Sequence, residues 1–300
     1  MVELKVISYN VHSCVGSDMN YSVDRIGQVL ERQDPAVVCL QEIEANHSTQ
    51  QTRVWSSVHS SHQPRELASS LALEHCHFAP AISSVASSRY REVHDCSDAK
   101  GGFGIATLSK YPILEVRRRT FHRFGRKTIR NALACLIALP NGAKVWVVNT
   151  HLGCHWGGEQ FQQAKELARF IDSLGMSSET CGPEDVSGII LCGDFNSLPF
   201  FRSVKVMKSF GLIDTWGTKG LGPGCTFPAD GKIPGLPRFC SRRRPVMRLD
   251  YIFVKSNDTC QEGRLLAKCA FVVNGEDNPV DLVASDHLPL CTTFEVWKIA

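Results

Sequence analysis

The sequence predicts an α/β fold in which mixed β-sheets pack face to face and helices cover their outer surfaces. Apolar strand-like runs alternate with amphipathic helical segments along the chain. Several neighbouring strands are joined by connections too short for a crossover, so a purely parallel sheet is excluded. The chain has 300 residues, 43% of them hydrophobic, which is enough to bury the large core of a layered fold.

The helices are predicted from apolar residues at helical spacing. In the first helix Val23, Ile26 and Leu30 recur on one side, and Ser22 is a suitable N-cap. The predicted helices span Ser22–Gln33, Pro64–Glu74, Glu159–Leu174 and Phe201–Ser209.

The strands are predicted from short apolar runs bounded by turn residues. The dipeptide Asn141–Gly142 predicts a two-residue hairpin turn between two of them. Glu42 is expected just beyond the end of the second strand. The predicted strands span Leu4–Asn10, Ala36–Gln41, Phe103–Leu108, Ile113–Val116, Ala132–Leu139, Lys144–Thr150, Gly188–Cys192, Leu249–Val254, Ala267–Val273 and Leu290–Val296.

The chain is expected to form a single domain over residues 1–300, since no Gly/Ser-rich or Pro-rich linker interrupts it. A Ser/His-rich stretch at about 46–100 is the one compositional shift. We interpret this stretch as an insertion around the second predicted helix.

The net charge of +3 is too small to indicate a nucleic-acid partner by itself. The basic residues are clustered, however, in the segment Arg117–Arg130 and in a group that contains Arg238, Arg242, Arg243, Arg244 and Arg248. These clusters predict either a positive rim that attracts an anionic substrate or a solvated strand edge.

The cysteines and the apolar runs indicate the compartment. The 13 cysteines form no C-x-x-C pair, and several, such as Cys39, Cys135 and Cys192, lie within apolar strands. No run approaches the length of a membrane span. A reducing, intracellular location, cytoplasmic or nuclear, is expected.

Polar residues gather at the ends of the predicted strands. Asn10, Glu42, His151, Asp194 and Asn196 lie at or just beyond the carboxyl ends of apolar strands, and Asp250 begins another. Asp286 and His287 shortly precede the last strand. Carboxylates that converge at one sheet edge repel one another unless a cation neutralises them. Oxygen ligands with few imidazoles and no thiolates favour Mg²⁺ or Mn²⁺ over zinc.

Short motifs in these regions resemble, in the same order, those of the endonuclease/exonuclease/phosphatase superfamily. Each motif alone is common, but their order and spacing over residues 6 to about 295 make the resemblance specific. The motifs are S-Y-N (Ser8–Asn10), L-Q-E (Leu40–Glu42), L-S-K-Y-P-I (Leu108–Ile113), V-N-T-H-L (Val148–Leu152), C-G-D-F-N-S (Cys192–Ser197), L-D-Y-I-F (Leu249–Phe253) and S-D-H-L-P-L (Ser285–Leu290).

The resemblance implies a four-layer α/β sandwich of two packed mixed sheets, forming one catalytic domain. It also implies a role for each matching residue. Glu42 would be the principal metal carboxylate, with Asn10 and Asp286 as auxiliary metal residues. Asp194 would orient or deprotonate the attacking water, and Asn196 would hold water or phosphate. His287, paired with Asp250, and His151 would contact the scissile phosphate. Arg130 is a further candidate for a phosphate contact, although a strand-edge arginine is the alternative.

The function implied is divalent-metal-dependent hydrolysis of a phosphodiester by in-line attack of water. Nucleic acid is slightly favoured as substrate, because aromatic and basic residues interleave between Arg119 and Arg126. The histidine of Asn149-Thr150-His151-Leu152 departs from the N-A-Y-type segment of abasic-site endonucleases, which lowers a DNA-repair assignment. A lipid-linked or small-molecule phosphate, as in sphingomyelinase-like or inositol-phosphate activities, is the first alternative. A catalytically silent binding protein on the same fold is the second.

Overall fold

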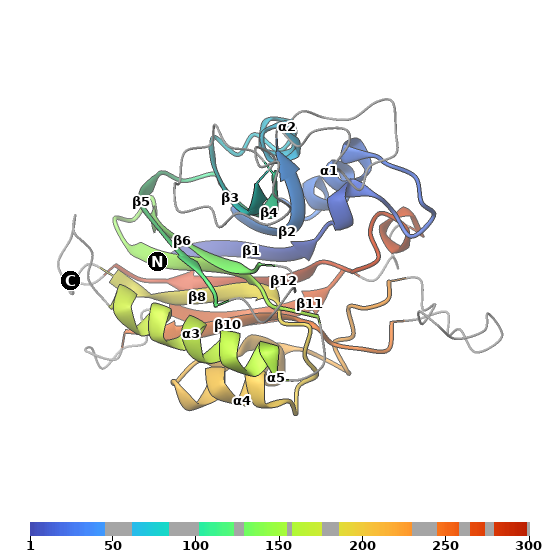
Figure 1. Cartoon of the computed structure of the whole chain (residues 1–300). Helices are drawn as coiled ribbons and strands as arrows, with labels where there is room; N and C mark the ends of the chain where they lie inside the picture. The colour runs from blue at the N-terminus through green and yellow to red at the C-terminus, as the bar shows by residue number, and fades with distance from the viewer. Residues whose placement is uncertain are drawn as a thin grey trace.

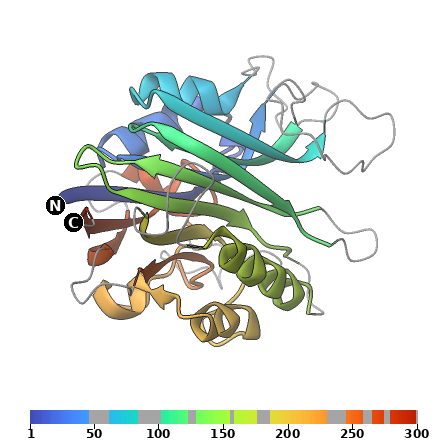
Figure 2. The same cartoon turned by 90° about the vertical axis from the view of Figure 1, so that its left-hand side faces the viewer.

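The structure, a computed structural model, describes residues 1–45, 62–83, 102–122, 129–154, 158–175, 186–229, 245–257, 265–273 and 279–298. Two mixed six-stranded β-sheets lie face to face, and helices cover their outer surfaces (Figures 1 and 2). This arrangement confirms the predicted four-layer α/β sandwich.

The first sheet has the strand order β11-β12-β1-β2-β4-β3. Strands β1 and β2 are parallel and joined through helix α1 (Val23–Glu31), while the other neighbours are antiparallel. The strands span Val2–Asn10 (β1), Val37–Ala45 (β2), His75–Ser83 (β3), Gly102–Ser109 (β4), Leu265–Val272 (β11) and Leu290–Val296 (β12).

The second sheet has the order β5-β6-β7-β8-β10-β9. Among its described strands the one parallel pair is β7 and β8, which are joined through α3 (Glu159–Leu174) in a β-α-β crossover like that of β1 and β2. The strands span Ile113–Thr120 (β5), Asn131–Ala138 (β6), Lys144–His151 (β7), Val186–Asp194 (β8), Ile213–Asp214 (β9) and Asp250–Ser256 (β10).

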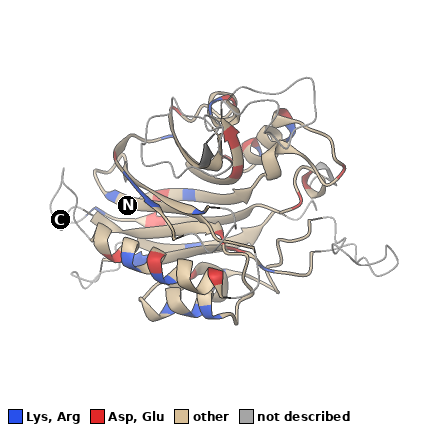
Figure 3. Cartoon of the chain, viewed as in Figure 1, with Lys and Arg blue, Asp and Glu red and all other residues tan. Residues whose placement is uncertain are grey.

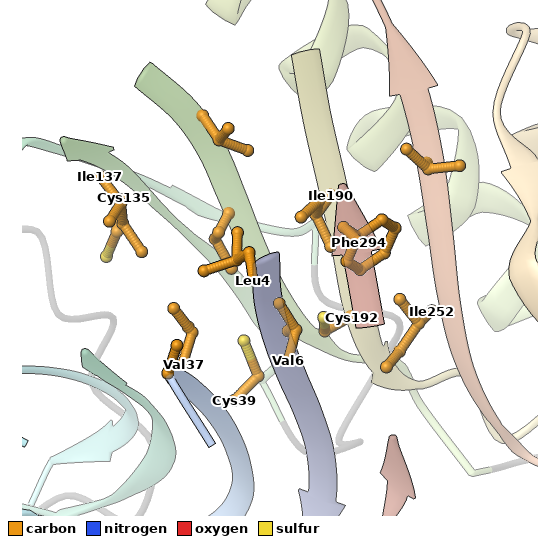
Figure 4. Close-up of a cluster of buried hydrophobic side chains, with 14 of the residues drawn as sticks. Leu4, Val6, Val37, Cys39, Cys135, Ile137, Ile190, Cys192, Ile252 and Phe294 are labelled. Atoms are coloured by element: carbon orange, nitrogen blue, oxygen red, sulfur yellow. The ribbon is translucent and has the colours of Figure 1, made fainter. Parts of the chain in front are cut away.

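Three apolar clusters hold the layers together. The central cluster lies between the sheets and includes Leu4, Val6, Ile190 and Phe294 (Figure 4). Three cysteines belong to it, Cys39, Cys135 and Cys192, and all three are fully buried. Burial raises the pKa of Cys39 and of Cys135, so their thiols remain protonated and pack as small apolar groups.

The helices complete the two outer layers. Helices α1 and α2 (Gln63–Ser70) pack on the first sheet, while α3 and α4 (Arg202–Ser209) pack on the second. A short helix, α5 (Thr215–Lys219), follows β9, and the described residues also form the 3-10 turns η1 (His12–Cys14) and η3 (Pro279–Leu282). None of the helices in the described ranges is long and apolar enough to cross a membrane.

Most predicted helices and strands are confirmed, often to within a few residues. Helix α3 has the predicted bounds, and the Ser22 side chain caps α1 by accepting a hydrogen bond from the Arg25 backbone N–H at 3.1 Å. The prediction missed β3, which pairs with β4 at the edge of the first sheet. The Ser/His-rich stretch therefore contributes a sheet strand as well as α2, and its residues 46–61 and 84–100 lie outside the described residues.

The turn between β6 and β7 differs from the predicted two-residue hairpin. Leu139 N–H donates to Ala143 O at 2.8 Å, which closes a three-residue loop of Pro140, Asn141 and Gly142. Gly142 has φ +81°, the left-handed residue that follows such a turn. The prediction was wrong because it overlooked Pro140, which favours the first central position of an ordinary β-turn.

Two buried amide side chains connect the sheets. Gln41 of β2 donates through Nε2 to Asn149 Oδ1 of β7 at 2.8 Å. Asn149 Nδ2 donates in turn to Leu40 O at 3.0 Å and to Ala106 O at 2.8 Å, both in the first sheet. The contact fixes the relative position of the sheets at the middle of β2, beside Glu42, and near the carboxyl end of β7.

We expect Asn149→Ala to destabilise the fold by about 2–4 kcal/mol, because it removes three buried hydrogen bonds, to Gln41 Nε2, Leu40 O and Ala106 O. Urea denaturation would measure the loss, with Asn20→Ala as a surface control. A variant within about 0.5 kcal/mol of wild type, the usual range of surface changes, would contradict this role for the amide contact.

Candidate functional site

Eight of the nine predicted site residues meet at one edge of the sandwich, because both sheets present the ends of their central strands there, and the ninth, Arg130, contacts His151. Asn10 ends β1, His151 ends β7 and Asp194 ends β8. Asp250 begins β10 and lies opposite Asp194 in the antiparallel register. His151 lies opposite Asp194 in the parallel register on the other side. The strand pairing alone therefore places three of the residues beside one another.

Asp194 lies at the centre of the cluster and is almost completely buried. Asn10 Nδ2 donates to Asp194 Oδ2 at 3.0 Å, and the Asn196 backbone N–H donates to Asp194 Oδ1 at 2.8 Å. Burial raises the pKa of Asp194 to about 7, although the positive charge of His287 opposes this shift. The carboxylate is thus held in a fixed orientation and titrates near neutrality in the metal-free protein.

His287 and Asp250 form a buried pair, with His287 Nδ1 at 2.8 Å from Asp250 Oδ2. The Thr226 hydroxyl donates to the same oxygen at 2.5 Å. Burial lowers the pKa of His287, but the negative charges of Asp250 and Asp194 outweigh it and raise the pKa to about 10. His287 Nε2 lies 3.8 Å from Asp194 Oδ2, so the imidazolium faces the centre of the cluster.

His151 lies between the buried guanidinium of Arg130 and the carboxylates. Arg130 Nη1 is 3.1 Å from His151 Nδ1, and Asn196 Nδ2 is 3.1 Å from His151 Nε2. Arg130 Nη1 and Asn196 Nδ2 can only donate hydrogen bonds, whereas a neutral imidazole accepts a hydrogen bond at only one of its two nitrogens. Asn196 Nδ2 also donates to Leu152 O at 3.0 Å. We therefore assign Nδ1 as the acceptor, which leaves Nε2–H facing the carboxylates.

Those carboxylates are Asp194 and Glu42. His151 Nε2 lies 3.5 Å from Asp194 Oδ2 and 3.9 Å from Glu42 Oε1. The sequence predicted that Glu42 lies just beyond the end of its strand, and this prediction is wrong. Glu42 lies within β2 at an irregularity in the pairing with β4, between Gln41 and Ile43. A bulge of this kind inserts one residue and changes the direction of its side chain.

Two site residues have left-handed backbone conformations. Glu42 has φ +53° and Asn196 has φ +46°, and neither is glycine. Such conformations cost about 1–3 kcal/mol each and are concentrated at functional sites. The residues of η1, directly after Asn10, also have positive φ. The backbone around the cluster is therefore held by the surrounding structure against its local preference.

Asp286 lies at the border of the cluster and is half-buried. The Ser285 hydroxyl lies 2.8 Å from Asn10 O and 3.4 Å from Asp286 Oδ1. The negative charge of Asp286 contributes to the raised pKa of His287. The chain segment with Asp286 and His287 is thereby attached to the end of β1.

The donor set fits a hard divalent cation. Asp194 and Asp250 offer carboxylate oxygens that lie within 4.8 Å of each other and of a His287 nitrogen, while His287, as an imidazolium, contributes positive charge in place of a ligand atom. Asp250 Oδ1 is buried, and among the described residues it has no hydrogen-bond partner. Asn10, Glu42 and Asp286 add oxygen donors, and the described cluster contains no thiolate. Carboxylate and amide oxygens are the ligands that Mg²⁺ and Mn²⁺ prefer.

Of the two interpretations of the basic clusters, the described residues favour a strand edge over a positive rim (Figure 3). Arg248 does not belong to it, because Arg248 is buried and binds Asp214 through two contacts of 3.1 and 2.7 Å. Residues 230–244, with the other arginines of that cluster, and residues 123–128 lie outside the described residues. Arg117 and Arg119 lie on β5, an edge strand, where they approach Glu115 and Glu166.

Sequence reasoning missed two supporting residues, Thr226 and Phe227. Thr226 binds Asp250, and the Phe227 ring lies 4.7 Å from the His287 ring, centroid to centroid. Neither lies in a recognisable motif. Only the fold brings their loop beside β10. Gln41 and Asn149, in contrast, lie within the L-Q-E and V-N-T-H-L motifs, and their role is to connect the sheets.

The His287 pKa gives a pH-dependent stability. Its folded value of about 10 lies above the ordinary 6.5, so its contribution is complete below pH 6.5 and is lost as the pH rises to about 10. In metal-free protein, the stability difference between wild type and His287→Gln should shrink over that range in urea titrations. A difference that is constant with pH would show that His287 is not held as an imidazolium.

Comparisons with known proteins place this geometry in a family. The model of the endonuclease/exonuclease/phosphatase family matches residues 7–287, and no curated protein sequence matches the chain. The chain is similar to the solved endonuclease/exonuclease/phosphatase of Beutenbergia cavernae (19% identity, TM-score 0.67), covering 100% of this chain and 73% of that one.

Two further solved structures have the same fold. D. rerio TDP2, complexed with a single-strand DNA product, is 18% identical with a TM-score of 0.63, covering 99% of this chain and 100% of that one. The mannosyl-6-phosphatase of Bacteroides thetaiotaomicron is 16% identical with a TM-score of 0.68, covering 97% and 99%. These structural likenesses support the fold. Because the family model extends from β1 to His287, the chain belongs to the endonuclease/exonuclease/phosphatase family.

Proposed function

We propose that the protein is a divalent-metal-dependent phosphoesterase that hydrolyses a phosphodiester by in-line attack of water. The observation that carries the proposal is the buried cluster of Asp194, Asp250 and His287, with Glu42, Asn10 and His151 around it. Members of the family are phosphoester hydrolases. We further propose that residues 1–300 form one catalytic domain.

Glu42, Asn10 and Asp286 are the proposed residues for holding Mg²⁺ or Mn²⁺. When bound, such an ion supplies a Lewis acid that neutralises charge on a phosphoryl oxygen. Burial without enough nearby positive charge disfavours the ionised form of Asp194 and raises its pKa. A bound cation would supply that charge, so the raised pKa supports a cation in this site.

Asp194 is the proposed residue that orients or deprotonates the attacking water. The hydrogen bonds from Asn10 and Asn196 fix the direction of its carboxylate, as a residue that positions or deprotonates water requires. Asn196 is held by Leu152 O and lies beside His151, in a position to hold water or phosphate.

The two histidines are the proposed phosphate contacts, with different charge. His287, protonated beside Asp250, would donate to an oxygen on which negative charge develops. His151 would donate through Nε2 as a neutral group, positioned by Arg130. Arg130 is buried, and its Nε atom has no hydrogen-bond partner among the described residues, which supports a direct or nearby phosphate contact.

Nucleic acid is the proposed substrate, and TDP2 with its single-strand DNA product supports it by analogy of fold. The mannosyl-6-phosphatase supports the alternative, a small-molecule or lipid-linked phosphate. The second alternative, a silent binding protein, is disfavoured by the retained carboxylates and imidazoles. An intracellular location, cytoplasmic or nuclear, is supported by the free thiols of the described cysteines.

We expect Asp194→Asn to lower turnover of bis-p-nitrophenyl phosphate by at least about 100-fold, because it removes the proposed base. The assay would compare this diester with p-nitrophenyl phosphate, with Mg²⁺ or Mn²⁺ and with EDTA. Asp24→Asn, an exposed matched change, should retain activity. Activity that survives EDTA, or near-full activity of Asp194→Asn, would refute the mechanism.

Glu42→Gln should weaken Mn²⁺ binding by about tenfold or more, since it replaces a charged ligand with a neutral one. Isothermal titration calorimetry of the metal-free protein would measure the affinity, and Glu31→Gln serves as a surface control. Equal affinities for wild type and Glu42→Gln would exclude Glu42 as a principal ligand.

A further inference from the structure

The segment from Phe200 to Leu221 exposes an unusual number of large apolar side chains. It contains four of the nine exposed large hydrophobic residues found in the described part of the chain. Phe200 is 65% exposed, Ile213 54% and Leu221 89%, and Phe210 is also exposed. Scattered single residues of this kind are normal, but a concentration within one segment marks an interaction surface.

The same segment is strongly basic. Arg202, Lys205, Lys208 and Lys219 are all exposed, and Figure 3 shows basic residues along α4 at the bottom of the view. Asp214 is the one acidic residue in the sequence from 195 to 229. Asp214 is buried and bound to Arg248, with Lys208 Nζ at 3.8 Å. The exposed charge of the segment is therefore positive.

The segment forms one side of the molecule. It consists of α4, which packs on the outer face of the second sheet, of β9, the edge strand of that sheet, and of α5, which follows β9 and contacts β10 and β11 (Figure 2). We call this the α4–α5 surface, meaning the exposed side chains of residues 200–221. Strand β11, whose exposed Leu266 and Phe271 are apolar, lies against α5.

Both ends of the segment connect to the candidate site. Phe200 follows Asn196 by four residues, and its ring packs on the Phe201 ring at 5.1 Å. After Leu221 the chain returns to Thr226, which binds Asp250. A partner on the α4–α5 surface would therefore lie next to the elements that carry the site.

The side chains favour one kind of partner. Leu221, the most exposed member, and Ile213 cannot stack on nucleic-acid bases, although the exposed Phe200 and Phe210 offer aromatic rings that could. A two-fold contact with a second copy would place the same positive surface against itself. Apolar side chains among lysines and arginines match a lipid surface, where the apolar groups enter the interface and the cations meet anionic headgroups.

We propose that the α4–α5 surface docks the protein on membranes that contain anionic phospholipids. Docking is carried by Phe200, Ile213 and Leu221 entering the interfacial region and by Arg202, Lys205 and Lys208 at the headgroups. The inference does not depend on the proposed function, because it requires no intact catalytic site.

Vesicle co-sedimentation of the full chain tests the proposal, with phosphatidylcholine vesicles that contain or lack phosphatidylserine. Wild type should partition onto the serine-containing vesicles and much less onto the neutral ones. Lys205→Ala with Lys208→Ala should lower partitioning roughly 25-fold, at about fivefold per cation. Lys110→Ala with Lys298→Ala removes the same charge elsewhere and should have little effect.

The apolar contribution needs its own variants. Phe200→Ser and Leu221→Ser should each lower partitioning about tenfold, whereas Leu114→Ser, an exposed residue of β5, should not. Circular dichroism confirms that each variant folds. The proposal is overturned by equal partitioning of all variants, by no preference for anionic vesicles, or by the same variants weakening single-stranded oligonucleotide binding while vesicle binding is unchanged.

Discussion

The hydrogen bond between Gln41 and Asn149 is the constraint on which the rest of the site depends. It joins the two sheets within the buried core, one residue before Glu42 and two residues before His151. The candidate site takes Asn10 and Glu42 from the first sheet, Asp286 and His287 from the connection that leads into β12, and the others from the second sheet. Distances between these groups are therefore set by how the sheets align. Apolar packing alone is not directional, whereas an amide pair with its carbonyl partners fixes one alignment.

Strand pairing and burial also determine the electrostatics of the site. The pairing of β8 with β10 brings Asp194 and Asp250 beside one another, both are buried, and the pair shares a single imidazolium, His287. Burial raises the pKa of Asp194 as a result. The arrangement is tolerated because Asn10, Asn196 and Thr226 satisfy most of the carboxylate oxygens. A cluster of this kind gains stability from any cation that binds it, which couples metal binding to folding.

Left-handed backbone conformations also help to position the site residues. Glu42 and Asn196 both adopt left-handed conformations, one at a strand irregularity and the other in the turn after β8. Each is held by neighbours rather than by its own preference: Gln41 is bonded across the sheets, and Asn196 is bonded to Asp194 and to Leu152. The same turn continues into Phe200 and α4, so the site and the α4–α5 surface share one connection.

The sequence by itself determined the layered α/β class, most strands and helices, and the identity of the polar residues at the strand ends. These follow from periodicity, capping and burial, which act over a few residues: Ser22 caps α1, and α3 has its predicted bounds. The tertiary structure decided what depends on distant neighbours. It placed Glu42 inside a strand, made Arg130 a buried partner of His151 and Arg248 a partner of Asp214, and brought Thr226 to Asp250. The partner of each of these side chains depends on how remote segments of the chain pack together, and short-range sequence patterns do not specify that packing.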